Sequence, residues 1–296
     1  MDKNMQPIRT ILLRPNAKKD DGFAVSRGTA TYLLSRGAAV LVPDALLPAF
    51  AGIGVLGESA GIVPELILSL GGDGTVLAAS EEAIARDVPL LGINMGRLGF
   101  LAELETDQLK KLDALFTGEY TVTRRMTLSV SADLGEGETE LPGYPLNDVV
   151  FSHDREDGLA LLSLSDQAGN VIDYHADGLI LATPSGSTAY TLSAGGPIVD
   201  DEMDAICVTP VCPHSFFNRS VIFGRDARLT VENRSPLGRD VTVSLDGRER
   251  LRLPFGSAVT VGRSDHPLKM LSFDRHAVLS TLNRKMQMAD MKYRNE

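Results

Sequence analysis

Hydrophobic and polar positions up to Gly118 follow two patterns in turn. Short apolar runs predict buried strands, and apolar residues at every third or fourth position predict helices between them. Strands are expected at residues 8–13, 38–42, 66–70 and 88–93, and helices at 23–36, 76–86 and 106–118. Thr75 and Thr106 stand where side chains commonly cap a helix N-terminus. Strands that alternate with helices predict a parallel sheet with helices on its faces.

The pattern changes near Tyr120, where apolar residues begin to fall at every second position. This spacing is typical of strands, and the runs that follow are short and separated by turn signals. Further strands are expected at residues 148–151, 159–164, 171–174, 178–183, 205–209, 228–231, 241–245 and 258–261, with helix-like stretches at 187–193 and 276–291. We therefore expect an α/β domain at 1–122, a mostly antiparallel β-rich domain at 123–269, and a helical tail at 270–296 that packs back on the first domain.

Composition and charge restrict the class of protein. A chain of 296 residues that is 43% hydrophobic and 23% charged is expected to be globular, with a core large enough for two domains. Its formal net charge of -10 argues against nonspecific binding to nucleic acid or to anionic membranes. The polar N-terminus shows no signal or membrane-spanning run, and only two cysteines occur, so a cytoplasmic protein is expected.

The first candidate site is the Gly-Gly-Asp-Gly-Thr turn at 71–75, between a predicted strand and a predicted helix. Glycines let backbone N–H groups come close to phosphate oxygens, and the helix dipole attracts anions. A carboxylate repels phosphate, so Asp73 is expected to accept a proton from a hydroxyl or to hold Mg²⁺. An ordinary strand-to-helix turn is the alternative.

Two further stretches carry candidate chemistry. At the start of a predicted strand, Asn147 and Asp148 suit a sugar or base edge, although a turn cap is the simpler explanation. Residues 177–199 combine a buried strand, a Pro-Ser-Gly-Ser-Thr turn, a short helix and Gly-Gly-Pro. Small hydroxyl residues leave space and offer hydrogen bonds, and Tyr190 offers a stacking face.

Other patterns are weaker. The G-x-G-x-x-G match at 52–57 lacks a preceding strand and a following helix, so we interpret it as a loop. Cys207, Cys212 and His214 offer at most three zinc ligands, and core packing is favoured for Cys207. No G-x-x-x-x-G-K-[ST] motif is present, which excludes a P-loop kinase.

Together, the turn at 71–75, the Asn147-Asp148 pair and the run at 177–199 resemble the NAD kinases, in order and over most of the chain. The first motif is shared with diacylglycerol-type lipid kinases and phosphofructokinases, whereas the third run is specific. The resemblance implies a Rossmann-like N-terminal domain, a β-rich C-terminal domain and an active site between them.

The resemblance also implies Mg²⁺-dependent phosphoryl transfer to the adenosine-ribose 2′-hydroxyl of NAD, giving NADP, with ATP or polyphosphate as donor. Asp73 then corresponds to the general base and also contacts NAD. The other implied NAD contacts are Gly74, Asn147, Asp148, Asp177, Thr188, Ala189, Tyr190, Thr191, Leu192 and Ser193. Gly71, Gly72, Gly74 and Thr75 are expected to bind phosphate, and no protein residue is assigned to the metal.

The sequence departs from the family pattern at three positions. Asp148 stands where the family usually has the longer Glu, and His175 stands where many bacterial members have Arg. Arg248 follows Asp246-Gly247 at a position where the family often has an amide that touches substrate. We expect His175 and Arg248 to contact NAD.

Two alternatives to an NAD kinase are a lipid kinase that shares the first motif and a non-catalytic NAD sensor. The hydroxyl-rich residues 185–193 speak against an apolar lipid cleft, and Asp73 speaks against pure phosphate binding. We also expect a homodimer or homotetramer, because the strand edges of a β-rich domain need cover and the family usually forms such oligomers.

Overall fold

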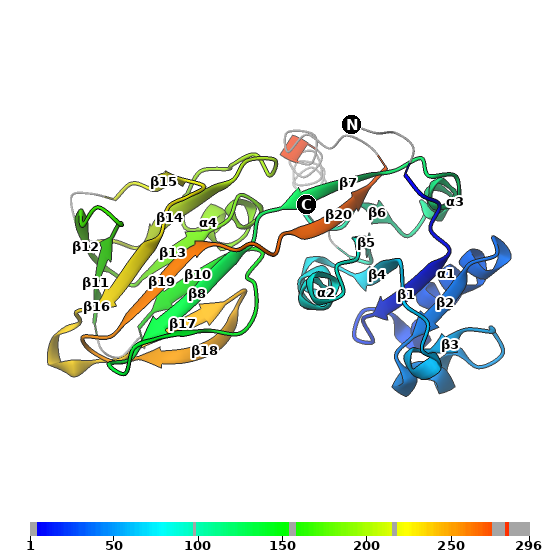
Figure 1. Ribbon diagram of the computed structural model, residues 1–296, viewed down its shortest axis with the longest axis horizontal. Coiled ribbons are helices and arrows are strands. Elements are labelled where there is room, and N and C mark those ends of the chain that lie inside the picture. The colour runs from blue at the N-terminus through cyan, green and yellow to red at the C-terminus, as the bar shows by residue number, and fades with distance from the viewer. Residues whose placement is uncertain (1–4, 97–98, 154–157, 215–217, 274–281, 284–296) are drawn as a thin grey trace, which may run out of the picture. The chain divides into compact units, whose positions relative to one another are not determined.

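The protein, seen here in a computed structural model, is described at residues 5–96, 99–153, 158–214, 218–273 and 282–283. It divides into two compact units (Figure 1). Unit 1 comprises Met1–Arg124 with Leu268–Glu296, and unit 2 comprises Arg125–Pro267. The change of pattern near Tyr120 therefore lies close to the first boundary between the units.

Unit 1 is built on one sheet with the strand order β3-β2-β1-β4-β5-β20-β7, and β6 also pairs with β5. Its strands are β1 (Thr10–Pro15), β2 (Ala39–Val42), β3 (Leu56–Gly57), β4 (Leu66–Gly71), β5 (Leu90–Asn94), β6 (Leu104–Glu105), β7 (Thr121–Arg125) and β20 (Leu268–Ser272). Its helices are α1 (Ala24–Ser35), α2 (Asp73–Ala85) and α3 (Ala114–Thr117), with 3₁₀ helices η1 (Asp21–Phe23), η2 (Asp44–Phe50), η3 (Glu58–Ala60) and η4 (Leu109–Asp113).

The central strands of unit 1 are apolar because helices and loops cover both of their faces. Every residue of β4 and every residue of β5 is buried, as expected for strands of a parallel sheet. The pairs β1–β2, β1–β4 and β4–β5 are all parallel. The carboxyl ends of β1, β4 and β5 therefore lie along the same edge of the sheet.

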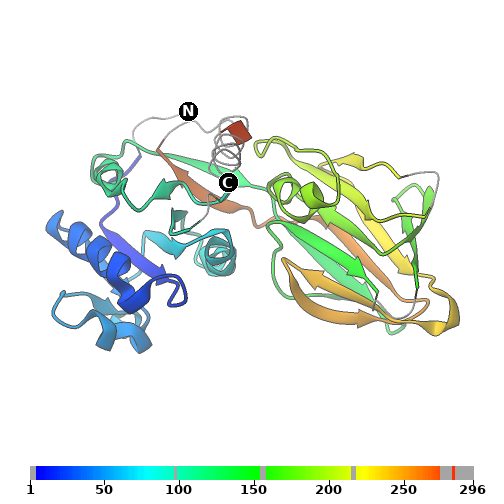
Figure 2. The same cartoon turned by 180° about the vertical axis from the view of Figure 1, so that it is seen from behind.

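Unit 2 is a pair of antiparallel sheets that enclose one apolar core (Figure 2). One sheet has the order β15-β14-β13-β10-β17-β18, and the other has the order β12-β11-β16-β19-β8-β9. The strands are β8 (Leu128–Asp133), β9 (Glu138–Glu140), β10 (Asp148–Ser152), β11 (Ala160–Ser165), β12 (Val171–Ala176), β13 (Gly178–Ala182), β14 (Ala205–Val211), β15 (Val221–Gly224), β16 (Leu229–Asn233), β17 (Val241–Leu245), β18 (Arg248–Leu253) and β19 (Ala258–Arg263). The helical segments are η5 (Ser185–Thr188), α4 (Tyr190–Ser193) and η6 (Pro236–Gly238).

The α/β unit and the antiparallel β-rich unit confirm the predicted fold class. The predicted tail is wrong at its start, because residues up to Ser272 form β20 in the sheet of unit 1. Leu268, Met270 and Leu271 are buried there, so their apolar side chains favour a place in the sheet over a helical tail that packs against it. The rest of the tail lies outside the described residues apart from 282–283, which are helical.

Two predicted helix starts are also wrong. Helix α2 begins at Asp73, so Thr75 lies in its first turn, and Gly72 occupies the N-cap position. The predicted helix at 106–118 is shorter and begins with the 3₁₀ segment η4, whose N-cap is Gln108. Neither Thr106 nor Gln108 caps this helix with its side chain: the Gln108 side chain makes no capping hydrogen bond and instead accepts one from the Glu105 N–H, before the helix, at 3.0 Å.

Candidate functional site

The order of strands in unit 1 creates a switch point between β1 and β4. From β1 the chain passes through α1 to β2 on one side, and from β4 it passes through α2 to β5 on the other side. In open α/β sheets, ligands bind beyond the carboxyl ends of the strands at such a point. The turn at 71–75 lies there, directly after β4.

The turn is shaped by close backbone packing. A Cβ atom on Gly71 would lie 2.1 Å from Thr75 Oγ1, so only glycine fits at this position. Thr75 Oγ1 accepts hydrogen bonds from the Gly72 N–H at 3.3 Å and from Asn16 Nδ2 at 2.9 Å. Thr75 thus ties the end of β1 to the start of α2. The Thr75 N–H donates to the Gly72 carbonyl at 2.7 Å, whereas the N–H groups of Asp73 and of the exposed Gly74 precede the first carbonyl of the helix that could accept from them.

Asp73 lies at the first position of α2 and holds the loop that follows β5. Its carboxylate accepts hydrogen bonds from the Phe100 N–H at 2.8 Å and the Leu101 N–H at 3.1 Å. A Cβ atom on Gly99 would lie 1.9 Å from Asp73 Oδ1, so glycine is what lets the loop approach the carboxylate. The side chain is half-buried, and each oxygen retains a lone pair that can accept a proton.

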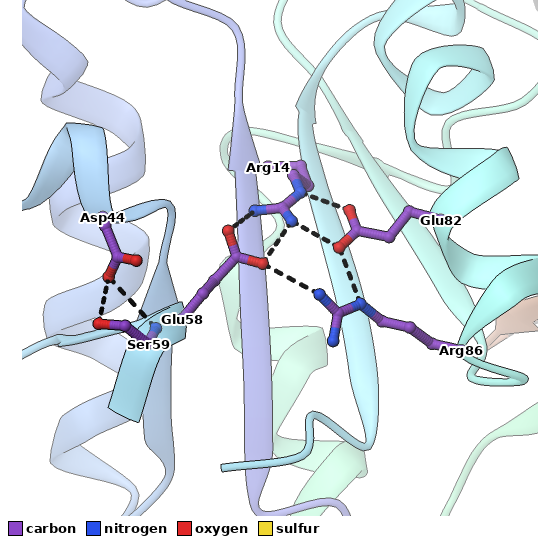
Figure 3. A network of polar contacts seen from close by, with 6 residues as sticks. All are labelled: Arg14, Asp44, Glu58, Ser59, Glu82 and Arg86. Atoms are coloured by element: carbon purple, nitrogen blue, oxygen red, sulfur yellow. Dashed lines mark hydrogen bonds and ion pairs between the residues drawn. The ribbon is translucent and has the colours of Figure 1, made fainter. Parts of the chain in front are cut away.

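Arg14, near the end of β1, is the centre of an ion-pair network (Figure 3). Its guanidinium donates to both oxygens of Glu58 at 2.7 and 3.0 Å, and to Glu82 on α2 at 2.6 Å through Nε. Arg86 joins the same two carboxylates at 3.2 and 2.8 Å. Burial lowers the pKa of Arg14, but the two carboxylates outweigh it and raise that pKa overall. The network fastens α2 to the sheet and occupies four of the five N–H donors of Arg14.

In unit 2, strand pairing gathers a second cluster at one end of a sheet. Asp148 at the start of β10 pairs with Ala182 at the end of β13, and Val149 pairs with Leu245 at the end of β17. The carbonyl of Asn147 accepts a hydrogen bond from the Thr183 N–H at 2.9 Å. The turn at 183–186 therefore lies against the Asn147-Asp148 pair.

Gly186 permits that approach. A Cβ atom on Gly186 would lie 1.9 Å from the carbonyl oxygen of Asn147, a distance that no larger residue tolerates. Its N–H donates to Thr183 Oγ1 at 3.0 Å, and the same hydroxyl donates to the Leu146 carbonyl. The hydroxyl-rich turn is thus anchored to the strand that carries Asp148.

Asp246 organises this cluster, although the sequence analysis did not select it. Its carboxylate accepts hydrogen bonds from the N–H groups of Leu146, Asn147 and Asp148 at 2.9, 2.8 and 3.0 Å. Both Asp246 and Gly247 have positive φ, at 49° and 75°, in the turn between β17 and β18. The Asp-Gly dipeptide is a strong hairpin signal, and the sequence named Asp246 only as the neighbour of the predicted contact Arg248.

Asp148 is buried, with 5% of its surface exposed. Burial, and to a smaller degree the neighbouring charge of Asp246, raises the pKa of its carboxyl group to about 7. An acid in this setting exchanges its proton near neutral pH, in contrast to an ordinary aspartate. The raised pKa distinguishes Asp148 from an exposed aspartate that caps a turn.

The predicted contacts at 188–193 differ in exposure. Thr188 and Ala189 are half-buried, and Tyr190, Leu192 and Ser193 are exposed. Thr191 is fully buried, and no hydrogen-bond partner of its hydroxyl lies among the described residues. The Thr191 side chain therefore packs inside unit 2, and its neighbours offer the accessible groups.

The structure separates two of the predicted contacts from the others. His175 and Asp177 are exposed near the start of β13, whereas Asp148 lies beside the end of that strand. A strand of five residues separates its ends by roughly 15 Å. Arg248 is exposed and pairs with Leu245, so it belongs to the end where Asp148 lies.

The described residues show neither a cluster of metal ligands nor a membrane-spanning helix. No group of three or more His, Cys, Asp or Glu side chains there is arranged to hold a metal ion. Both cysteines are free, and Cys207 is buried whereas Cys212 is exposed. Among the helices described, none is long and apolar enough to cross a membrane.

Comparison with known proteins supplies the family. Residues 58–120 match the ATP-NAD kinase N-terminal domain, and residues 146–273 match the ATP-NAD kinase C-terminal domain. An NAD kinase of Natranaerobius thermophilus is 33% identical over 94% of this chain and 98% of its own length. An NAD kinase of Geobacter sulfurreducens is 35% identical over 86% of this chain and 90% of its own length.

Solved structures share the fold. Yeast NADH kinase complexed with NADH superimposes with a TM-score of 0.84 at 22% identity, covering 96% of this chain and 89% of that one. An NAD kinase from Archaeoglobus fulgidus in complex with ATP gives a TM-score of 0.63 at 22% identity, covering 91% and 94%. The resemblance drawn from the sequence motifs is confirmed by these matches over both units, and the chain belongs to the ATP-NAD kinase family.

Proposed function

We propose that this protein transfers the terminal phosphoryl group of ATP to the 2′-hydroxyl of the adenosine ribose of NAD, giving NADP and ADP. The observation that carries the proposal is the glycine turn at the switch point of unit 1, where Asp73 opens α2. Family membership supports NAD as acceptor and ATP as donor. A lipid kinase and a non-catalytic sensor have no comparable support.

Asp73 is the proposed general base. As the ribose 2′-oxygen forms its bond to the γ-phosphorus, the bond from that phosphorus to the β,γ-bridging oxygen breaks, and the hydroxyl proton passes to the Asp73 carboxylate. The Phe100 and Leu101 amides hold the carboxylate in one orientation without using all of its lone pairs. A base of this kind contributes about 10²- to 10⁴-fold in rate.

The donor phosphates are proposed to lie on Gly71, Gly72, Gly74 and Thr75, at the N-terminus of α2. Helix N-termini offer N–H donors and a favourable dipole to phosphate oxygens. Gly72 joins β4 to α2, and a Cβ atom there would lie 2.5 Å from Lys19 Nζ, so glycine keeps this part of the turn clear.

Mg²⁺ is the proposed metal. No protein residue is assigned to the ion, because Asp73 is the proposed proton acceptor, and Mg²⁺ usually keeps several waters and binds substrate phosphates. When bound, the ion would draw negative charge from the transferred phosphoryl group.

Unit 2 is proposed to bind NAD. Asn147 can donate to and accept from hydroxyls, ionised Asp148 can accept from them, and Tyr190 offers an exposed ring for stacking. Thr188, Ala189, Leu192, Ser193 and Arg248 add accessible groups around them. His175 and Asp177 remain proposed NAD contacts, at the other end of β13.

The decisive experiment incubates the purified protein with NAD, ATP and Mg²⁺ and detects NADP with an NADP-specific dehydrogenase. NADP well above a blank is expected. Folded protein that makes none would contradict the proposal. A parallel reaction with polyphosphate in place of ATP decides the preferred donor.

A homodimer or homotetramer in the cytoplasm is also proposed. The edge strands β12 and β15 carry exposed apolar side chains, with Val171 56% and Ile222 50% exposed, which suits strand edges covered by another copy. The exposed free thiol of Cys212 suits a reducing compartment. Light scattering at micromolar concentration should give a multiple of 31.8 kDa, and the mass of one chain would refute the oligomer.

A further inference from the structure

The connection from β1 to α1 brings a lysine onto the glycine turn. A Cβ atom on Gly72 would lie 2.5 Å from Lys19 Nζ, and one on Gly96 would lie 3.7 Å from the same nitrogen. The ammonium group therefore lies directly over the backbone that follows β4 and close to the loop after β5. No motif in the sequence pointed to Lys19.

The backbone that carries Lys19 is held in place at the switch point. Asn16 donates its N–H to the Leu70 carbonyl at 2.9 Å and accepts from the Lys19 N–H at 3.0 Å. Asp20 is buried and accepts from the N–H groups of Val25 and Ser26 at 2.9 and 2.8 Å. Lys19 thus projects from a connection that is anchored on both sides.

The Lys19 ammonium is a cation without a counter-ion in the part of the chain that the structure describes. No hydrogen bond or ion pair of its side chain is formed there, and the residue is exposed. Arg14, five residues earlier, is engaged by Glu58 and Glu82. Of these two cations near the end of β1, only Lys19 is available to an anionic ligand.

A buried acceptor beside Gly72 supports the same ligand. Asn94 is 2% exposed and ends β5, and its Nδ2 donates to Glu105 at 3.0 Å. Its Oδ1 has no hydrogen-bond partner among the described residues, and it lies 3.9 Å from the position of a Cβ atom on Gly72. A phosphate oxygen is itself an acceptor and cannot bond to Asn94 Oδ1. An ammonium group that lies between Asn94 and the phosphate can donate to both.

We propose that Lys19 is a binding residue for the phosphates of the donor, an assignment that rests on the proposed function. Its ammonium would donate to the phosphate oxygens laid on Gly72 and, on its other side, to Asn94 Oδ1. An ammonium carries three N–H donors, so it can serve both partners at once. The ligand class is a polyphosphate chain, either that of ATP or the inorganic chain itself.

The test compares Lys19→Met with two matched variants. Lys18→Met removes the same charge from the neighbouring exposed residue, and Lys19→Arg retains the charge. Titration calorimetry with inorganic tripolyphosphate reads phosphate binding without any reaction, and steady-state kinetics reads KM for ATP and for NAD separately. Thermal unfolding confirms that each variant is folded.

We expect Lys19→Met to weaken tripolyphosphate binding and to raise KM for ATP about ten-fold, the size typical of a charge-assisted hydrogen bond. KM for NAD should change less than about two-fold, Lys18→Met should resemble the unsubstituted protein, and Lys19→Arg should recover part of the loss. These effects should weaken at high salt.

Unchanged tripolyphosphate binding in Lys19→Met would overturn the assignment, as would an equal loss in Lys18→Met or no measurable binding by the unsubstituted protein. The calorimetric readout is independent of turnover. A protein that makes no NADP would therefore refute the proposed function, while a selective loss of tripolyphosphate binding in Lys19→Met would still support the phosphate contact.

Discussion

Unit 1 and unit 2 use the same device at their candidate sites, a carboxylate that accepts backbone N–H groups from a loop distant in sequence. Asp73 holds Phe100 and Leu101 in unit 1, and Asp246 holds the chain from Leu146 to Asp148 in unit 2. The surroundings differ. Asp73 opens a helix N-terminus on a glycine turn, whereas Asp246 lies beside a second, buried acid.

The difference shows how one kind of hydrogen bonding can serve two purposes. At the helix N-terminus, the carboxylate faces the space where phosphates are proposed to bind, so it can act on the substrate. In the hairpin turn, the Asp246 carboxylate accepts three backbone N–H groups and thereby fixes the orientation of the residues that carry them. Substitutions at the two sites should therefore change different kinetic constants.

The largest effect is expected at Asp73. Asp73→Asn removes the proposed proton acceptor and should lower kcat at least ~10²-fold, while KM for NAD changes much less. The new amide nitrogen also loses one of the two bonds to Phe100 and Leu101, so the fold should survive with a looser loop. Steady-state kinetics and thermal unfolding measure both effects.

Gly99→Ala is the control for loop anchoring. Its Cβ would clash with Asp73 Oδ1, so it disturbs the contact but leaves the carboxylate ionisable. We expect a loss of at most ~10-fold in kcat. If Gly99→Ala lost as much activity as Asp73→Asn, or if Asp73→Asn kept nearly normal kcat, Asp73 would be a structural residue like Asp246.

The next effect concerns stability and should be confined to unit 1. Arg14→Met leaves Glu58 and Glu82 facing each other with only Arg86 between them. Because the network is partly buried, we expect a loss of about 2 kcal/mol in unfolding free energy. Hydrogen exchange should become faster in β1 and α2 and remain unchanged in β16 and β19. Equal acceleration in both units would show that the network does not act locally.

A smaller effect is expected at Asp246. Asp246→Asn cannot accept all three N–H groups equally, so the Asn147-Asp148 backbone should shift and KM for NAD should rise about ten-fold. Because Asp246 is not proposed to touch the reacting atoms, kcat should fall by less than ~3-fold. A drop in kcat as large as that of Asp73→Asn would remove the distinction between the two carboxylates.

The last effect concerns the pH dependence of stability in unit 2 and involves no kinetic constant. The pKa of Asp148 is about 7 in the folded chain and near 3.8 when unfolded, so the folded state retains a proton that the unfolded chain releases. Its contribution to stability therefore falls as pH rises from about 4 to about 7. Asp148→Asn should remove this dependence, so its stability relative to the unsubstituted chain should be higher at pH 8 than at pH 4 by up to about 4 kcal/mol.

Chemical denaturation of both proteins from pH 4 to pH 8 gives the difference curve. The gain of Asp148→Asn over the unsubstituted chain should grow across this range and then level off. A difference that is constant with pH would show that Asp148 titrates like an ordinary aspartate. The charge of Asp246 contributes to the raised pKa of Asp148, so Asp246→Asn should lower the pH at which the difference curve levels off.

Local patterns in the sequence were sufficient for much of unit 1. The apolar run at 66–70, the glycines after it and the helix beyond predicted β4, the turn and α2, because neighbouring residues along the chain specify such a turn. Even so, the start of α2 differed from the prediction. A helix start depends on the hydrogen bonds that its first residues make. The Thr75 hydroxyl accepts from Asn16 Nδ2 and from the Gly72 N–H.

The short strands of unit 2 were also predicted from alternating apolar residues, but charged or very short strands were not. In unit 2, the edge strand β18 is rich in arginine and glutamate. In unit 1, β20 lies largely in the segment that was predicted to be a helical tail. In both cases the partner strand decides the conformation, since β-propensity depends on the packing of side chains against neighbouring strands.

The sequence by itself thus determined the fold class, the family, and the residues that carry motifs, because these depend on chemistry between near neighbours. Tertiary structure decided which of them meet. Asp246 reaches Asp148 across 98 residues of sequence, Lys19 reaches Gly72 through the strand order, and His175 is placed away from Asp148 by strand register. Register and strand order follow from pairing and burial over the whole sheet, and no local stretch of sequence contains that information.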